Sequence, residues 1–368
     1  MFEKPKLILG LALVLTGRLA SISLGAEDPA RFPILDFETN GIMCGYIDTS
    51  GKIAIPLTTN WSLMDDGPRY FLEGLQPTCF HGQTWNQGWG YLDPQGKVAI
   101  ASRFSYAQPF SEGLAAVRDA SGYGYIDHTG QYVIPPQFAE AFAFSNGYAL
   151  VQVSNLWGYI DKHGAYIIKP QQYHTTATHG FAEGLVWVEK DGKWGCVNEK
   201  GETVIGFKFT DASYFSEGLA PVDVADHHAP PDLQGTMGYI DKTGAFVIAP
   251  QFYAAWNFSA GLARVQAGRN MAYIDKQGKI AFTITNGLWA DEFSEGLANV
   301  SIRNSRDGTI PETWGYINLK GDFVIQPQYQ MAKPFYHGLA QVFLNGHEGY
   351  IDKTGKFVWQ GKPEPFEK

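Results

Sequence analysis

Short apolar runs separated by polar turns recur along almost the whole chain at a fixed spacing. The peptide Gly-Tyr-Ile-Asp, with variants, occurs nine times, and Phe-Ser-Glu-Gly-Leu-Ala, with variants, occurs eight times. The spacing from Tyr125 to Gly147 and the spacing from Gly147 to Tyr159 each recur in five units, so the basic period is about 34 residues, which is the signature of a repeat architecture. The Tyr positions are Tyr46, Tyr91, Tyr125, Tyr159, Cys196, Tyr239, Tyr273, Tyr316 and Tyr350.

Each Tyr position opens a predicted β-hairpin. A Gly lies five residues after every Tyr position, and an Asp or Asn lies two residues after it, as in Asp161-Lys162-His163-Gly164. Between two apolar runs, this spacing predicts a type I turn closed by a left-handed residue, for which Gly has no Cβ penalty. The Asp side chain is expected to accept hydrogen bonds from the turn amides. Trp-Gly-Tyr-Ile-Asp and Lys-Phe-Val-Ile are then the two arms of the hairpin.

The rest of the unit predicts a third strand. Pro recurs at one spacing after the Tyr position, at Pro136, Pro170, Pro250 and Pro327, where it is expected to stop the second arm because it cannot donate to a ladder. A Phe lies three residues before each of the eight motif Gly residues, which predicts a buried anchor. The following Gly-Leu-Ala-x-Val is predicted to be a strand. Each unit is therefore a predicted three-stranded antiparallel meander.

The apolar pattern also constrains how the units pack. Segments such as Tyr132-Val133-Ile134 have apolar side chains on both faces, so neighbouring units are expected to cover both, and the Gly beside Trp is expected to leave room for a close backbone or ring. Because the period is short and nine units exceed the usual blade number, the fold predicted for residues 27–361 is an all-β, open β-solenoid-like array, with a β-propeller as the alternative. The longest insertions, at 78–87, 225–236 and 304–313, fall at one point of the repeat. They are expected to lie on one side of the array.

These hairpins resemble those of WG (KWG) repeat proteins. The residues that carry the resemblance are Trp89-Gly90-Tyr91, Trp157-Gly158-Tyr159, Lys193-Trp194-Gly195 and Trp314-Gly315-Tyr316, each followed by Phe-Ser-Glu-Gly-Leu or a close variant. The likeness extends from about Ile34 to Trp359. In the other five units the Trp position is Cys44, Tyr123, Met237, Met271 or Glu348. The resemblance implies a bacterial, often exported repeat array.

The N-terminus reads as a targeting segment. Lys4 and Lys6 precede the apolar stretch 7–17, and small residues surround Gly25 and Ala26, which predicts a cleaved secretory signal over residues 1–26. An uncleaved membrane anchor is the alternative, but the stretch is shorter than the roughly 20 residues that span a bilayer. We therefore expect an exported protein (periplasmic, secreted or at the cell surface) that is not an integral membrane protein after cleavage. Residues 362–368 form a C-terminal tail.

Composition narrows the function classes. The chain has 368 residues, of which 45% are hydrophobic and 18% charged, and its net charge is -9. The apolar share is ample for a folded core, and the negative charge argues against nucleic-acid binding. Motifs for a nucleophile elbow, a phosphate loop or an HExxH metal site do not occur, so no catalytic residue and no cofactor is expected.

Two weaker chemical signals remain. His227 and His228, with Asp226 beside them, lie in an insertion and are weak candidates for a metal site, since such runs are more often solvated. Cys44 and Cys79 belong to the first two units and are candidates for a disulfide in an oxidising compartment. Cys196 would then be a buried small residue at a Tyr position.

The favoured function is a non-catalytic binding or surface-interaction module whose partner is a protein or a cell-surface glycan. Stacked repeats offer a long surface, and the insertions offer contacts specific to single units. The alternative is a carbohydrate-active or other hydrolytic enzyme, which would need paired carboxylates that break the repeat pattern and converge.

Overall fold

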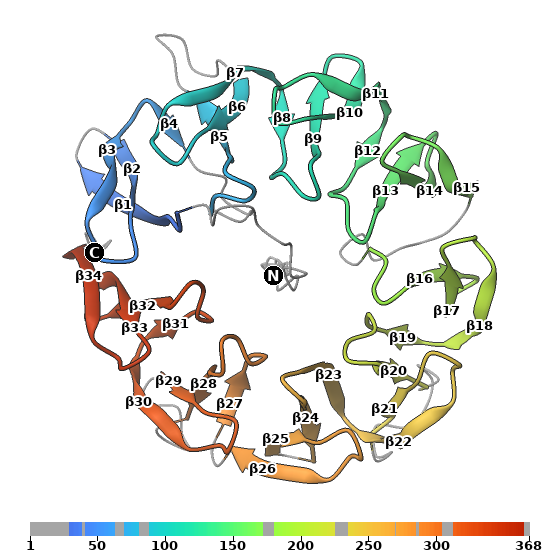
Figure 1. Cartoon of the computed structure of the whole chain (residues 1–368). Helices are drawn as coiled ribbons and strands as arrows, with labels where there is room; N and C mark the ends of the chain where they lie inside the picture. The colour runs from blue at the N-terminus through green and yellow to red at the C-terminus, as the bar shows by residue number, and fades with distance from the viewer. Residues whose placement is uncertain are drawn as a thin grey trace, which may run out of the picture.

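The computed structural model describes residues 29–38, 41–62, 70–80, 88–171, 180–224, 235–268, 270–284, 287–303 and 312–363. The predicted signal segment therefore lies outside the described residues. Nine antiparallel sheets surround a common centre, and they form a nine-bladed β-propeller (Figure 1). The open array is therefore wrong, and the alternative, a propeller, is confirmed.

The nine blades are numbered in chain order. Blades one to three are β1 (Phe32–Glu38), β2 (Gly41–Ile47), β3 (Ile53–Thr58); β4 (Trp61–Ser62), β5 (Gln76–Phe80), β6 (Gly88–Leu92), β7 (Val98–Phe104); and β8 (Tyr106–Ala107), β9 (Ala115–Asp119), β10 (Gly122–Ile126), β11 (Tyr132–Phe138). Blades four to six are β12 (Glu140–Ala141), β13 (Tyr148–Val153), β14 (Leu156–Asp161), β15 (Tyr166–Gln171); β16 (Leu185–Lys190), β17 (Lys193–Asn198), β18 (Thr203–Phe209); and β19 (Asp211–Ala212), β20 (Ala220–Asp223), β21 (Met237–Ile240), β22 (Phe246–Phe252). Blades seven to nine are β23 (Ala254–Ser259), β24 (Leu262–Ala267), β25 (Asn270–Ile274), β26 (Ile280–Ile284); β27 (Gly287–Ala290), β28 (Ala298–Ile302), β29 (Thr313–Ile317), β30 (Phe323–Tyr329); and β31 (Met331–Ala332), β32 (Leu339–Leu344), β33 (His347–Asp352), β34 (Phe357–Pro363).

Most blades have a fourth strand, so the three-stranded unit is also wrong. In seven blades the short strand after the Pro-aromatic segment pairs with the Gly-Leu-Ala-x-Val strand and forms the edge of the sheet opposite the outer strand (Figure 1). We call it the inner strand. The Phe-Ser-Glu-Gly-Leu motif is a two-residue hairpin turn between these two strands. Ser111 and Leu114 exchange backbone hydrogen bonds, and both intervening residues have positive φ, 56° at Glu112 and 89° at Gly113. Both values are those of a type I′ turn.

The outer hairpin turn is confirmed. In the turn that begins at Asp161, the amide of Gly164 donates to the carbonyl of Asp161 at 3.0 Å, and Gly164 has a φ of 83°. The Asp161 carboxylate accepts from the amides of His163 and Ala165, both at 2.9 Å. The equivalent Gly has positive φ in all nine blades.

Pro does not stop the outer strand. β15 continues through Pro170, and β22 continues through Pro250. An edge strand can contain Pro because its outer side needs no ladder donor. Opposite Pro170 the strand bulges, and a Cβ on Gly158 would lie 2.6 Å from the carbonyl oxygen of Ile168. The Gly after Trp is therefore required by the close approach of its own outer strand.

The core lies between adjacent blades. Each motif Phe is buried, and most of them contact the Tyr of the preceding blade; the ring centroids of Tyr125 and Phe144, for example, are 4.8 Å apart. The Tyr125 hydroxyl donates to the carbonyl of Phe142 in the next blade at 2.8 Å. In blade five, where Cys196 replaces Tyr, Trp187 of the neighbouring strand stacks on Phe215 at 6.0 Å. The predicted buried anchor is confirmed.

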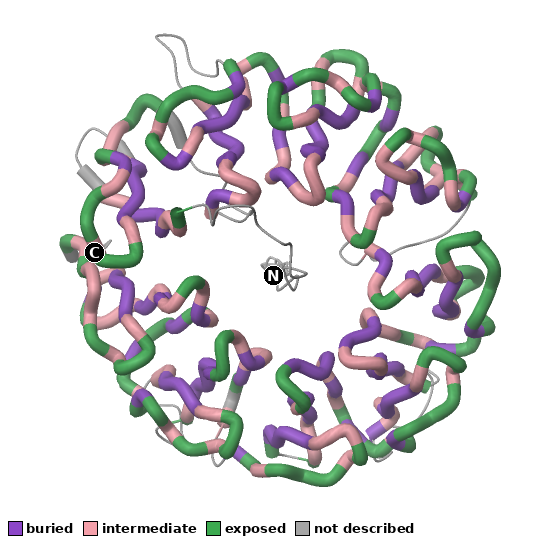
Figure 2. The backbone as a smooth tube through the Cα atoms, in the orientation of Figure 1, coloured by how far each residue is buried: buried purple, intermediate pink, exposed green. Residues whose placement is uncertain are grey.

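The outer strands are not covered on both faces. Val133 is 45% exposed, Val247 is 48% exposed and Ile280 is 48% exposed. Figure 2 shows burial concentrated in the middle strands of the blades and exposure along the outer edge of the ring. A ring spreads its sheets apart at the periphery, so the outermost side chains have no neighbouring blade against them.

Contacts between blades nine and one close the ring. Tyr350 donates to the carbonyl of Pro33 at 2.7 Å, and its ring lies 5.4 Å from that of Phe32. Lys362 pairs with Asp36 at 2.8 Å. Phe32 and Pro33 of β1 thus give Tyr350 a ring contact and a carbonyl acceptor like those that the Tyr of other blades receives, although the two residues come in the reverse order along the chain. β1 completes the seam from the opposite end of the chain.

Candidate functional site

The repeated turn carboxylates stabilise their own turns. Asp241 accepts from the amide of Thr243 at 2.9 Å, from its hydroxyl at 2.6 Å and from the amide of Ala245 at 3.1 Å. The hydroxyl bond to Thr243, with those amides, lowers the pKa of Asp241 below its ordinary value. Asp48, Asp127 and Asp352 have the same Ser or Thr contact and a lowered pKa.

The motif carboxylates join one blade to the next. Glu112 of blade three accepts from the amide of Gly147 in blade four at 2.8 Å and pairs with Lys162 of that blade at 3.1 Å. Equivalent contacts begin at Glu73, Glu183, Glu217 and Glu295, and His128 replaces Lys in the first of them. These Glu and Asp side chains therefore have structural roles.

The two kinds of turn lie on one face of the ring, which we call the turn face. Along each blade the chain makes the Glu-Gly turn, crosses to the opposite face, returns and makes the Asp turn. The opposite face, the loop face, has the connection between the second and third strands and the connection to the next blade. The insertions at 78–87, 225–236 and 304–313 all join second to third strands. The strands that flank all three insertions therefore meet on the loop face, and most of the inserted residues themselves lie outside the described ones.

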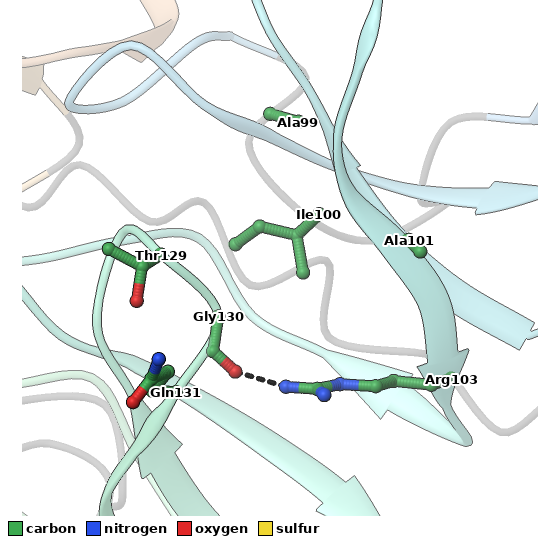
Figure 3. Close-up of a pocket in the computed structure, with 7 residues that line it drawn as sticks. All are labelled: Ala99, Ile100, Ala101, Arg103, Thr129, Gly130 and Gln131. Carbon is green, nitrogen blue, oxygen red and sulfur yellow. Dashed lines mark hydrogen bonds between the residues drawn. The ribbon is translucent and has the colours of Figure 1, made fainter.

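A shallow pocket of about 310 Å³ lies at the outer edge between blades two and three (Figure 3). Arg103 reaches across it and donates to the carbonyl of Gly130. The same position in blade five holds Lys208, which donates to the carbonyl of Gly244 at 3.5 Å. Each cation also lies over the Phe that follows it, Arg103 at 4.9 Å. Because the arrangement recurs, we assign this pocket to blade packing.

Features that break the repeat gather in blades six to nine. On the loop face, large apolar side chains are exposed on four consecutive blades: Val224 at 43%, Tyr253 at 52%, Trp289 at 58% and Met331 at 39%. Trp289 and Met331 each precede an Ala on the inner strand, and at that position blades four and six have the charged residues Glu140 and Asp211. Two of the three insertions, 225–236 and 304–313, belong to blades six and eight. This half of the loop face is the candidate binding surface.

Blade seven also contains a buried cation. Arg264 lies at the variable position of Gly-Leu-Ala-x-Val and is only 8% exposed. Its guanidinium lies 3.7 Å from the centre of the Trp256 ring. Burial lowers the pKa of Arg264, and the nearby charges of Asp291 and Glu292 oppose that shift. Sequence reasoning missed Arg264, although a charged residue between buried apolar positions was a readable signal.

The predicted chemical sites have different outcomes. His227, His228 and Asp226 lie outside the described residues, and no cluster of three metal-ligating side chains occurs within the described ones. The structure contains no disulfide between Cys44 and Cys79, which lie buried on β2 and β5. Cys196 is buried, and burial raises the pKa of its thiol. Within the same described ranges, no helix is long and apolar enough to cross a membrane.

The fold and the hairpin chemistry define a β-propeller built from Trp-Gly hairpins. The chain belongs to the WG containing repeat family, whose repeat matches residues 89–120, 123–157, 157–194, 194–225, 237–269 and 314–346. No curated protein matches the sequence.

Similarity to one solved structure supports the fold at low sequence identity. A crystal structure of the eukaryotic initiation factor is similar with a TM-score of 0.57 at 11% identity, over 91% of this chain and 96% of that one. BamB from Moraxella catarrhalis has a TM-score of 0.42 at 11% identity, over 73% of this chain and 90% of that one.

Proposed function

We propose that this chain is an exported, non-catalytic binding protein and that the loop face of blades six to nine is its binding surface. The observation that carries the proposal is the row of exposed apolar side chains on that face, which includes Tyr253 and Trp289. Exposed aromatic side chains are enriched at interaction sites, and here two of them lie on the same face of consecutive blades. The partner is a protein or a glycan of the cell surface.

The rigidity of the scaffold supports the same proposal. Glu contacts on the turn face and Tyr–Phe contacts in the core join consecutive blades, so the loops are held on a fixed frame. Variable loops on a fixed frame are where binding specificity usually lies.

A hydrolytic enzyme is the second candidate because of one pair of carboxylates. Asp291 and Glu292 precede the motif Phe293, and no other unit has a carboxylate at either position. One of them is already used structurally, since Asp291 accepts from the side-chain amide of Asn299 at 2.7 Å. That contact favours the binding function over hydrolysis.

The test uses residues 27–368 on a glycan array and against purified cell-envelope proteins. The Trp289→Ser and Tyr253→Ser double variant is expected to lose the binding that the parent chain shows. The matched control replaces two exposed apolar side chains of the outer edge, Val98→Ser with Ile280→Ser, and is expected to bind normally. Equal binding by the two double variants would contradict the assigned surface. Release of sugar from a bound glycan, lost in Glu292→Gln, would favour the enzyme.

A further inference from the structure

Arg264 is a buried cation whose hydrogen-bonding groups are unused. Among the described residues it has no hydrogen bond and no ion pair, and its Nε is both fully buried and without a partner. Its two terminal nitrogens are not among the fully buried, unpartnered atoms, so they keep access to solvent. Arginine carries five N–H donors and stays protonated in proteins.

A buried arginine without hydrogen-bond acceptors destabilises the folded protein unless a bound group accepts from its N–H donors. A buried charge is normally paired, and a buried donor without an acceptor loses the hydrogen bonds that it made with water. Packing over Trp256 offsets part of that cost because a cation is attracted to the face of an indole ring. The ring face supplies no acceptor for the N–H groups. The contact therefore orients the guanidinium and leaves the N–H groups of its two terminal nitrogens available to a ligand.

Arg103, one of the two other arginines that lie over an aromatic ring among the described residues, shows an arginine with a satisfied donor in this fold. Arg103 lies over Phe104 and donates to the carbonyl of Gly130 in the next blade. Arg264 lies over Trp256 with no such acceptor, although blade eight is next to it. The difference between the two is the missing acceptor.

We propose that Arg264 binds the carboxylate of a sugar acid, such as a uronic acid, between blades seven and eight. A planar carboxylate matches the guanidinium fork and accepts two parallel hydrogen bonds from it. A monoanion fits better than a phosphate dianion, because Asp291 and Glu292 are close enough for their charges to act on Arg264. One oxygen of Asp291 accepts from the side-chain amide of Asn299, and its other oxygen is suited to accept from a sugar hydroxyl. Trp256, which is half-buried, adds an aromatic surface of the kind on which sugar rings pack.

The experiment titrates residues 27–368 with sodium glucuronate and follows ligand signals by saturation-transfer NMR. We expect weak binding, with a dissociation constant on the order of 1 mM for so small a ligand. Arg264→Met is expected to weaken it roughly tenfold or more, because the charged hydrogen bonds are lost. Arg264→Lys keeps the charge but loses the guanidinium fork, so it is expected to lose less affinity. It keeps the test valid if Arg264→Met fails to fold. Arg103→Met is the matched control and is expected to bind like the parent chain.

Three results would overturn the proposal. The first is that the folded parent chain does not bind glucuronate, and the second is that Arg264→Met binds it as well as the parent does. The third is that inorganic phosphate, or N-acetylalanine with its peptide-type carboxylate, binds more tightly than glucuronate. Glucose, which lacks the carboxylate, is expected not to bind. The inference goes beyond the loop-face proposal and fails separately from it, since the Trp289→Ser and Tyr253→Ser variant is expected to titrate normally with glucuronate.

Discussion

Single glycines in this protein are explained by backbone approach. Gly158 faces a bulge in which the outer strand places the Ile168 carbonyl and the Pro170 nitrogen within 3.0 Å of where a Cβ would lie. Ala272 replaces this Gly in blade seven, and there the register runs from Met271 to Tyr273 without a bulge. The sequence predicted a close neighbour at this Gly, and that prediction was right. It could not show that the neighbour is the outer strand of the same blade, because the bulge is a backbone feature.

Gly158→Ala is therefore expected to destabilise the protein, whereas Ala272→Gly is expected to have a small effect. The added methyl of Gly158→Ala meets backbone atoms that cannot rotate away, so we expect a loss of about 2 kcal/mol or more. Ala272→Gly increases the conformational entropy of the unfolded chain and removes one methyl group, so we expect it to lower the free energy of unfolding by about 1 kcal/mol or less. Urea unfolding followed by tryptophan fluorescence gives both values. Equal losses would show that the bulge does not require Gly.

The turn carboxylates predict a measurable dependence on pH. Because the folded pKa of Asp241 is below its unfolded value, its contribution to stability is present at neutral pH and is lost as pH falls through the folded pKa. Thr243→Val removes the hydroxyl that donates to it, so the pKa of Asp241 is expected to rise toward the ordinary value of 3.8. Carboxyl-carbon NMR between about pH 2 and 6 measures the change. Asp352, whose contact with Thr354 is untouched, is expected to keep its lowered pKa.

At the scale of strands and hairpins, the outer hairpin was predictable and the inner one was not. Nine turns with Asp or Asn and Gly at fixed positions predict the outer hairpin, because each residue type is required by the turn. In five of eight units the inner hairpin uses Glu-Gly, where Asn-Gly or Asp-Gly is the common signal, and its inner strand has only two residues in β8, β12 and β31. Two residues are too few for an alternating pattern. The Glu of this turn also contacts the next blade.

Blade five tests how one strand compensates for another. Cys196 leaves space at the Tyr position, and Trp187 of the paired strand stacks on Phe215 instead. Cys196→Tyr alone is expected to overpack this seam and cost about 1–3 kcal/mol. Combined with Trp187→Ala, the new Tyr has room to contact Phe215 as in other blades. The double variant is therefore expected to be more stable than the sum of the two single losses predicts, as measured in a double-mutant cycle. Additive losses would mean that the two sites pack independently.

At the scale of the whole molecule, the sequence predicted stacking of units and could not decide between ring and open array. Contacts such as Tyr125 with Phe144 join neighbours only, and either arrangement would contain them. Closure depends on the angle between blades. That angle follows from a short inner strand, such as β8, and a longer outer strand, such as β11, in the same blade. Closure shows at Phe32 of β1, which is fully buried and contacts Tyr350 of blade nine, whereas the terminal strand of an open array would have no such neighbour. The candidate site could likewise not be predicted from the sequence, because Val224 and Met331 lie on one face only once the ring has folded.

Ring closure gives the last prediction, a comparison of Phe32→Ala with Phe110→Ala. Both side chains are almost completely buried and both contact a Tyr, Phe32 with Tyr350 and Phe110 with Tyr91. Phe110 anchors an internal seam, whereas Phe32 anchors the seam between the two ends of the chain. In a closed ring each truncation removes a full inter-blade anchor, so each is expected to cost about 3–5 kcal/mol. In an open array Phe32 would lie at a free end, and its truncation would cost little because terminal segments are held by few contacts. Denaturant unfolding of the two variants, with hydrogen exchange of the β1 amides to locate the effect, separates these cases. A loss at Phe32 far below that at Phe110, with unprotected β1 amides in the parent chain, would contradict closure.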